Sequence, residues 1–238
     1  MLWQEDKKKE AFVVPDTVAD LSFRVDCKQV PLDHAQELSD AILSILPWMA
    51  DEPEAAIHMI HGASTGNGWQ RPDNETNNGC IYLSKRSRMQ IRMPKTRHED
   101  AKELIGKTIT LGGYELTFGD FQVKMFSPLS TQFSRHVILE NNETEEQFLG
   151  RVSDVLKNEM GITLRKALCG LGDSFELDGD RVKTMSIMVA DLDPEEAVAL
   201  QTKGVGDEQV RGFGIFIPHK GINAVGDASD KSHFDGTK

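Results

Sequence analysis

This 238-residue chain has few cysteines, no long apolar run and no recognisable export signal. No apolar run approaches the ~20 residues that a membrane-spanning helix needs, and the opening segment MLWQEDKKKE lacks the apolar core of a signal peptide. The three cysteines, Cys27, Cys80 and Cys169, have no metal-ligand spacing and cannot all pair, which favours a reducing compartment. We therefore expect a cytoplasmic protein that makes no membrane contact.

Basic residues are outnumbered by acidic ones, and the formal net charge is −11. Nucleic-acid binders normally present a basic surface to phosphates, so this total argues against that class of partner. The segment IYLSKRSRMQIRMPKTRH, residues 81–98, is an exception, because it contains six Lys and Arg residues and no acid. A local basic strip on an acidic body can still bind RNA. The alternative is a solvated strand whose edge is protected by charge.

A doubled glycine motif lies near the C-terminus. Two Gly-x-Gly pairs, Gly204/Gly206 and Gly212/Gly214, flank five residues that include Arg211. Glycine lets backbone N–H groups approach a phosphate closely. The motif follows a helical stretch and feeds a strand, unlike a Rossmann loop, and it lacks the Gly-Lys-Ser/Thr ending of a P-loop. We therefore expect a loop along a ribose-phosphate backbone, with an ordinary flexible connection as the alternative.

The order of the predicted elements repeats. The first unit begins with an alternating strand, Leu21–Val25, and a helix from His34 to Leu46 that Asp33 is placed to cap. Strand, helix, two strands, helix and strand follow one another in this unit and again from residue 134 onward, which is the βαββαβ order. The first unit includes an expected strand at 57–61. In the second, helices are expected to start at Thr144 and Asp193, GLGDSFELDGDR is expected to be a turn-rich connection, and the last strand is expected at 215–217. We expect an α+β protein with two tandem ferredoxin-like domains of the RRM type. The expected segments are a lead-in at 1–17, domains at 18–126 and 134–222, and a polar, disordered tail at 223–238.

GVG-DEQVR-GFG resembles the C-terminal glycine-rich loop of the RAMP superfamily of CRISPR-associated proteins. Within that superfamily the chain is similar to the repeat-processing endoribonucleases of the sixth Cas family, in the Myxococcus-type subgroup. Further matching stretches are DLSFRVDCKQVPLDHAQELSDAI, IHMIHGASTGNGW and GFGIFIPHKGI, so the similarity covers residues 18–222. It implies metal-independent cleavage of precursor CRISPR transcripts within each repeat, with no cofactor.

Histidine is the residue type to examine for such cleavage, because its pKa suits both proton-transfer steps. His34 is the first candidate, since a helix N-terminus disfavours the charged imidazolium, and the resemblance implies a catalytic histidine at the start of the first helix. His61 adjoins a glycine-rich polar segment and is the second candidate. Lys85 is proposed to oppose the developing charge, with Arg86 and Arg211 as alternatives.

A metal site and further catalytic histidines are less well supported by the sequence. His58 and His61 form H-x-x-H, but they would point to opposite faces of a strand and have no third ligand nearby. We therefore expect no metal site, although a metal-dependent hydrolase is a reading that metal analysis would test. We expect His98, His136 and His233 to lie on the surface.

RNA contacts are expected from the basic strip, the glycine loop and the segment after the last strand. Trp69 could stack on an unpaired base or pin its own loop to the core. The predicted RNA-binding residues are Arg86, Arg88, Arg92, Lys95, Arg97, Trp69, Gly204, Gly206, Arg211, Gly212, Gly214, His219 and Lys220.

The function implied by the resemblance is CRISPR RNA maturation. Attack by a 2′-OH would leave a 2′,3′-cyclic phosphate and a 5′-OH, and the expected partner is a repeat RNA stem-loop whose product the enzyme retains. Other subunits of a type I effector complex, including one coupled to a transposon, are further candidate partners. Two alternatives stay open: a non-cleaving RNA-binding subunit of such a complex, and a protein-interaction module that uses the acidic surface.

Overall fold

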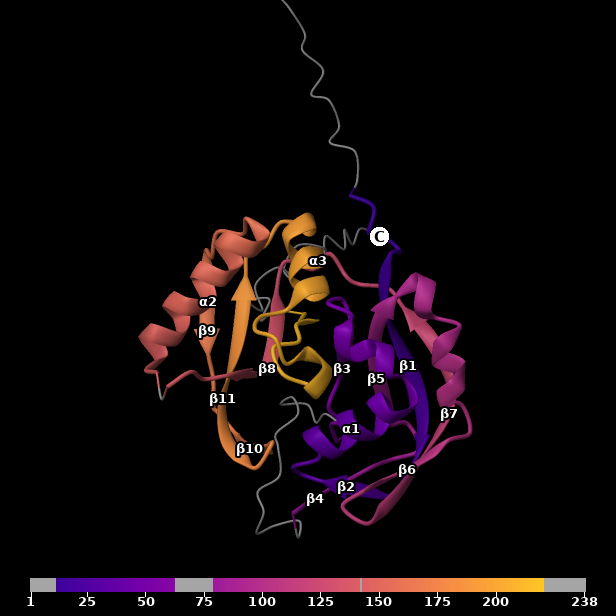
Figure 1. Ribbon diagram of the computed structural model, residues 1–238. Coiled ribbons are helices and arrows are strands. Elements are labelled where there is room, and N and C mark those ends of the chain that lie inside the picture. Colours follow the sequence, from indigo (N-terminus) through magenta and orange to yellow (C-terminus); the bar gives the residue numbers. More distant parts are fainter. Residues whose placement is uncertain (1–11, 63–78, 142, 221–238) are drawn as a thin grey trace, which may run out of the picture.

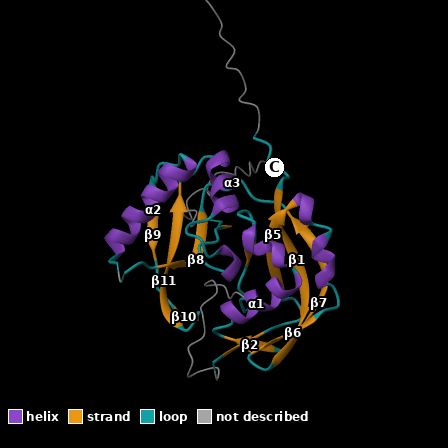
Figure 2. Cartoon of the chain, in the orientation of Figure 1, coloured by secondary structure: helices purple, strands orange, loops and turns teal. Residues whose placement is uncertain are grey.

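The computed structural model describes residues 12–62, 79–141 and 143–220. Two halves, each built on its own sheet, lie side by side, and α3 and the glycine-rich loop pass between them (Figure 1). Helices and sheets are both present in each half (Figure 2), so the predicted α+β class is confirmed. Within the described residues, no helix has the length and hydrophobicity that a bilayer crossing requires.

The N-terminal half is a five-stranded antiparallel sheet in the order β3-β5-β1-β7-β6. The predicted alternation holds in β1, where Leu21 and Phe23 are fully buried. A separate two-stranded ladder, β2–β4, was not predicted. The elements are β1 (Val18–Asp26), β2 (Gln29–Pro31), α1 (Ala35–Ile45), β3 (Ala56–Ile57), β4 (Cys80–Tyr82), β5 (Arg88–Pro94), β6 (Thr108–Leu111) and β7 (Tyr114–Lys124), with 3-10 turns at Pro47–Asp51, Lys95–Arg97 and Asp100–Leu104.

The start of α1 differs from its prediction. The helix begins at Ala35, and His34 is its N-cap residue. The carboxylate of Asp33 does not cap the helix; instead it accepts a hydrogen bond of 2.7 Å from the backbone N–H of Glu176 in the other half. A short polar side chain that could satisfy a helix N-terminus is therefore used to join the two halves.

The C-terminal half has the strand order β10-β11-β8-β12, with β9 also paired to β11. Both predicted helix starts are confirmed: Thr144 and Asp193 each form a capping box. Phe148, Val152 and Leu156 of α2 are fully buried in the core of this half. The elements are β8 (Gln132–Ile138), α2 (Glu145–Met160), β9 (Lys166–Cys169), β10 (Ser174–Leu177), β11 (Asp180–Ala190), α3 (Pro194–Lys203) and β12 (Ile217–Pro218), with a 3-10 turn at Gln209–Arg211.

Three predicted elements need correction. The strand expected at 57–61 ends at Ile57, so the region of His58 and His61 is not extended sheet. The turn-rich stretch GLGDSFELDGDR contains a strand, β10, because Phe175 and Leu177 are buried on one face. The last strand is Ile217–Pro218 rather than 215–217.

The two halves are joined by an apolar seam. Ala35 and Met59 from the N-terminal half form one buried cluster with Phe175, Leu177 and Phe213 from the C-terminal half. Burying an aromatic or aliphatic side chain of this size contributes roughly 1.5–3 kcal/mol. The seam fixes how the sheets face each other, and the polar site described next lies beside it.

Candidate active site and nucleic-acid interface

The glycine-rich loop is a tightly packed structure. Gly214 has a φ of +67°, and a Cβ built on it would lie 1.9 Å from the carbonyl oxygen of Val205. Its N–H donates to the carbonyl oxygen of His136 at 2.7 Å, while its own carbonyl accepts from the N–H of Val205 at 3.0 Å. Close backbone packing therefore explains the glycine at position 214 without any ligand.

The other glycines of the loop divide into two kinds, packed and open. Gly204 is packed, because a Cβ on it would meet the carbonyl oxygen of Gly214 at 2.5 Å. A Cβ on Gly212 would meet Met59 Cγ at 2.8 Å and the carbonyl oxygen of Ile57 at 3.3 Å, so this glycine lets the loop lie against the N-terminal half. A Cβ on Gly206 would meet nothing within 4 Å. Of these three, Gly206 is the one with open space beside it for another molecule.

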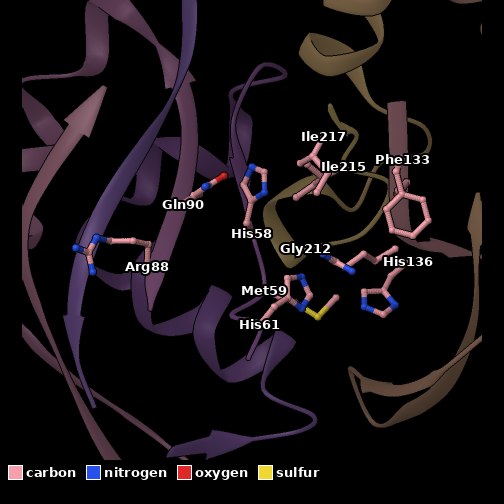
Figure 3. A pocket seen from close by; sticks show the side chains of 12 residues that line it. His58, Met59, His61, Arg88, Gln90, Phe133, His136, Gly212, Ile215 and Ile217 are labelled. Carbon is pink, nitrogen blue, oxygen red and sulfur yellow. The ribbon is translucent and has the colours of Figure 1, made fainter. Parts of the chain in front are cut away.

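A cavity of about 230 Å³ lies between the two halves, against this loop. Figure 3 shows His58, Met59 and His61 entering from the N-terminal half, with His136 and Phe133 opposite them and Gly212 between. The side chain of Arg88 points away from the imidazole rings (Figure 3). The lining residues are His58, Met59, His61, Arg88, Gln90, Phe133, Ser134, Arg135, His136, Gly212, Ile215 and Ile217.

His61, the second catalytic candidate from the sequence, lines this cavity. Its surroundings favour the neutral ring. Burial lowers the pKa of His61 well below 6.5, and the neighbouring charge of Arg135 and the nearby histidines lower it further. A neutral imidazole can accept a proton. His61 therefore has the protonation state of a general base near neutral pH.

His34, the first candidate from the sequence, is held by the backbone on both sides of its ring. Its side chain is only 2% exposed. Nδ1 lies 2.8 Å from the carbonyl oxygen of Pro31, and Nε2 accepts the N–H of Ile60 at 2.9 Å. Both ring nitrogens therefore meet backbone groups, and His34 holds the backbone immediately before His61. The catalytic role expected of His34 stays a prediction.

His58 belongs to a buried network. Its Nε2 lies 3.4 Å from Asp20 Oδ1, and the guanidinium of Arg92 donates to both oxygens of Asp20. Burial opposes ionisation of Asp20, but the charges and hydrogen bonds of Arg92 and His58 together outweigh it and hold the pKa of this carboxyl well below its usual range. Burial lowers the pKa of His58, although Asp20 opposes that shift.

Arg92 was expected to contact RNA, and the structure corrects this. The residue is 2% exposed. Besides Asp20, its guanidinium donates to the carbonyl oxygens of Gln201 and Phe216 in the C-terminal half. Arg92 thus crosses from β5 to the end of α3 and holds the two halves together.

The rest of the basic strip divides by location. Lys85 and Arg86 lie exposed in the turn between β4 and β5 and form no ion pair with any described residue, and Arg88 follows them at the cavity. Lys95 pairs with Asp16. Arg97 pairs with Asp100 and lies 4.8 Å above the ring of Trp48. Of the described cations in this strip, Arg88 is therefore the one that lines the cavity.

Arg211 is not presented to solvent as a bare cation. It pairs with Asp178 at 2.8 Å and with Glu208 at 3.3 Å, and its hydrogen bond to Asp178 raises its pKa. Contact of Arg211 with RNA stays a prediction, and a phosphate there would compete with these two carboxylates. His219 and Lys220 follow β12, and Trp69 and His233 lie outside the described residues.

Sequence reasoning missed two residues at the cavity, Arg135 and His136, both on β8. His136 was expected on the surface but is 6% exposed. Arg135 is partly buried, which lowers its pKa, and its guanidinium carbon lies 5.6 Å from the ring centre of Phe133. The adjacent Arg-His pair in the sequence carried no signal of a site, because only the packing of β8 against the glycine loop places it there.

Solved structures share this fold. A Cas6-related protein from Pyrococcus furiosus has a TM-score of 0.55 at 14% identity, with 86% of this chain and 100% of that chain covered. A CRISPR-associated Cas6 protein also has a TM-score of 0.55, at 12% identity, with 86% and 99% covered. A RAMP protein that binds different RNA substrates has a TM-score of 0.54 at 14% identity, with 84% and 98% covered. The fold is thus that of RAMP-type, CRISPR-associated proteins.

The family follows from the sequence. The family model described as Cas6 Crispr matches residues 19–221, and the chain therefore belongs to the Cas6 family. The CRISPR-associated endonuclease Cas6 of Myxococcus xanthus (strain DK1622) is 24% identical over 199 residues, which is 84% of this chain and 80% of that protein. The resemblance stated from the glycine motif is confirmed.

Proposed function

We propose that this protein matures CRISPR RNA by cutting precursor transcripts within each repeat. Membership of the Cas6 family supports this, as does the endonuclease activity in the name of the Myxococcus relative. The observation that carries the proposal is the cavity between the halves, where His61 lies beside a partly buried arginine and the glycine loop. Imidazole and guanidinium groups together can move protons and stabilise a phosphorane.

The proposed chemistry needs no metal. The 2′-OH of the ribose before the scissile bond attacks phosphorus, giving a 2′,3′-cyclic phosphate and a 5′-OH. His61 removes the proton from the 2′-OH, for which its neutral ring is suited. Arg135 opposes the extra negative charge on phosphorus, in the role that the sequence had suggested for Lys85.

The path of the RNA is proposed to run from the β4–β5 turn into the cavity. Lys85 and Arg86 would hold the backbone of a stem-loop by its phosphates, and Arg88 would continue this track to the cavity edge. His219 and Lys220 lie just beyond β12, which pairs with β8, and would contact the strand that leaves. Gly206 offers open space for close backbone approach.

We propose that His34 acts through its neighbours as a positioning residue. Its hydrogen bond to the N–H of Ile60 fixes the peptide one residue before His61. Loss of that bond would displace the base without removing it, and misplacement by about 1 Å can cost around 100-fold in rate. His34→Gln keeps an acceptor for Ile60, whereas His34→Ala does not.

The two halves are proposed to be tandem ferredoxin-like domains of the RRM type, at 18–126 and 134–222. The strand orders β7-β1-β5-β3 and β12-β8-β11-β9 support this, because each places the first and third strands of a βαββαβ unit at the centre. The protein is proposed to work in the cytoplasm and to retain its product, alone or with further subunits of a type I effector complex.

The test is incubation of purified protein with a synthetic RNA of one CRISPR repeat, taken from the array beside its gene, in EDTA. We expect one cut, a 2′,3′-cyclic phosphate on the upstream product and a 5′-OH on the downstream product. Dependence on added metal, or a 5′-phosphate product, would overturn the mechanism.

Variants at position 34 separate positioning from catalysis. We expect His34→Ala to lose cleavage while binding the repeat, and His34→Gln to recover much of it. If the Gln variant is as inactive as the Ala variant at unchanged RNA affinity, His34 itself transfers the proton.

A second candidate function is that of a non-cleaving RNA-binding subunit. The engagement of both His34 nitrogens by backbone groups favours it, because the residue expected to be catalytic is buried in the packing. Tight repeat binding without any cut in the same assay would establish this alternative.

A further inference from the structure

The cavity receives a second histidine from the opposite half of the protein. His136 on β8 and His61 after β3 have ring centres 6.1 Å apart, with ring planes tilted by 37°. Both rings line the same cavity, and Figure 3 shows them side by side at one end of it. Two imidazoles this close can both reach oxygens of one phosphate with hydrogen bonds of about 2.8 Å.

The position of His136 is fixed from several sides. Its carbonyl oxygen accepts the N–H of Gly214, so its backbone is held by the glycine loop. Its ring meets Phe175 edge-on at 4.8 Å between centres. The ring and the loop therefore form one rigid wall opposite His61, which is what proton transfer at a set distance requires.

The two histidines lie in different electrostatic surroundings. Asp173 Oδ2 is 3.6 Å from Nδ1 of His136, so a carboxylate faces this ring. By contrast, the guanidinium of Arg135 acts on His61 and favours the neutral ring there. A carboxylate beside one imidazole and a guanidinium acting on the other are surroundings that suit an acid and a base in one reaction.

We propose that His136 is the general acid of this site and protonates the leaving 5′-oxygen while His61 accepts the proton of the 2′-OH. This inference rests on the proposed ribonuclease function. The bond formed joins O2′ to phosphorus, and the bond broken joins phosphorus to O5′. One proton moves from the ribose to His61 and one from His136 to O5′, so no metal or other reactant is consumed.

A packing role for His136 is the alternative to exclude. A packing residue would affect folding and RNA binding, but the effect of removing it would not depend on the chemistry of the leaving group. Bridging sulfur at the 5′ position makes that distinction, because a thiolate leaves without being protonated. The cut site is first mapped with unmodified repeat RNA, and a second RNA then carries 5′-sulfur at that linkage.

The experiment measures single-turnover cleavage of both RNAs by the wild type, His136→Gln and His61→Gln. We expect His136→Gln to cut the oxygen substrate at least 100-fold more slowly than the wild type and the sulfur substrate within a few-fold of it. His61→Gln should stay slow on both substrates. His98→Gln, a histidine outside the cavity, serves as the matched control and should behave as the wild type on both.

The outcomes separate the two proposals. If the wild type does not cut unmodified repeat RNA, the proposed function itself fails. If the wild type cuts and His136→Gln is either fully active or equally slow on both substrates while RNA binding is retained, the acid assignment is overturned and the nuclease function stands. A melting temperature for each variant excludes unfolding as the cause of a slow rate, and His136→Asn provides a second variant if the Gln form does not fold.

Discussion

Two polar clusters connect the halves of this protein, and they differ in whether their charged groups are buried or line a cavity. In the first, Arg92 meets the carboxylate of Asp20 and two carbonyl oxygens, all buried. In the second, His61 and Arg135 line a cavity of about 230 Å³ together with His136. A balanced cluster inside the packing holds the halves together, whereas a guanidinium and imidazoles that line a cavity are suited to receive a phosphate. The same residue types are therefore proposed to serve structure in one place and chemistry in the other.

The largest effect is expected at the cavity. His61→Ala should reduce single-turnover cleavage of repeat RNA by about 10²–10⁴-fold, the usual contribution of a positioned proton-transfer group. Its affinity for the RNA should stay within a few-fold of the wild type, because phosphate contacts elsewhere are kept. Equal loss of rate and affinity would indicate that His61 is a binding residue.

The balanced cluster should show the opposite pattern. Asp20→Ala leaves Arg92 buried without its carboxylate, which typically costs about 3–5 kcal/mol of unfolding free energy. Denaturant titration would measure this loss. Glu99→Ala, which removes an exposed partner of Lys102, is the matched control and should leave the midpoint unchanged. A stable Asp20→Ala protein with impaired cleavage would mean that this cluster, too, takes part in the reaction.

Two glycines of the glycine loop are expected to differ in how much an alanine there destabilises the fold. Gly214→Ala places a methyl group 1.9 Å from the Val205 carbonyl oxygen, whereas Gly206→Ala places one in open space. Both positions have positive φ, at +67° and +86°, so backbone strain is similar and the difference isolates the clash. We expect Gly214→Ala to be the less stable by about 1–3 kcal/mol in chemical denaturation. Equal stabilities would show that the loop is looser than its packing indicates.

The smallest effect belongs to the exposed turn. Replacing Lys85 and Arg86 with Ala should weaken RNA binding and reduce the slope of log affinity against log salt by about one for each phosphate that the turn no longer neutralises. Cleavage at saturating RNA should not change. Lys102→Ala, an exposed cation already paired with Glu99, is the control. An unchanged salt slope in the double variant would move the RNA path away from this turn.

Local signals predicted much of the fold. Alternation predicted β1. The apolar face that begins at Phe148 predicted α2, and the Asp193 cap followed by Pro194 and two acids predicted the start of α3. Errors arose where distant residues decide the structure. Asp33 has the chemistry of a helix cap, yet its carboxylate accepts a hydrogen bond from the backbone N–H of Glu176, 143 positions away.

The site was less predictable for the same reason. Arg92 lies at a position of β5 where the alternating pattern predicts an outward-facing cation. That face of the sheet is covered by the C-terminal half, where the carbonyl oxygens of Gln201 and Phe216 accept its hydrogen bonds. His136 looks like a surface residue until β8 is packed against the glycine loop. The glycine motif identified the family, while the packing between the halves determines which cations and imidazoles are available to RNA.

The most direct test is a structure of the protein with repeat RNA that carries 2′-deoxyribose at the nucleotide before the cut, so that the bond stays intact. We predict the scissile phosphate in the cavity, with the 2′ position facing His61 and the 5′-oxygen facing His136. A scissile phosphate bound elsewhere, for example in the hollow between Asp33 and Arg181, would contradict the assignment of this cavity as the active site.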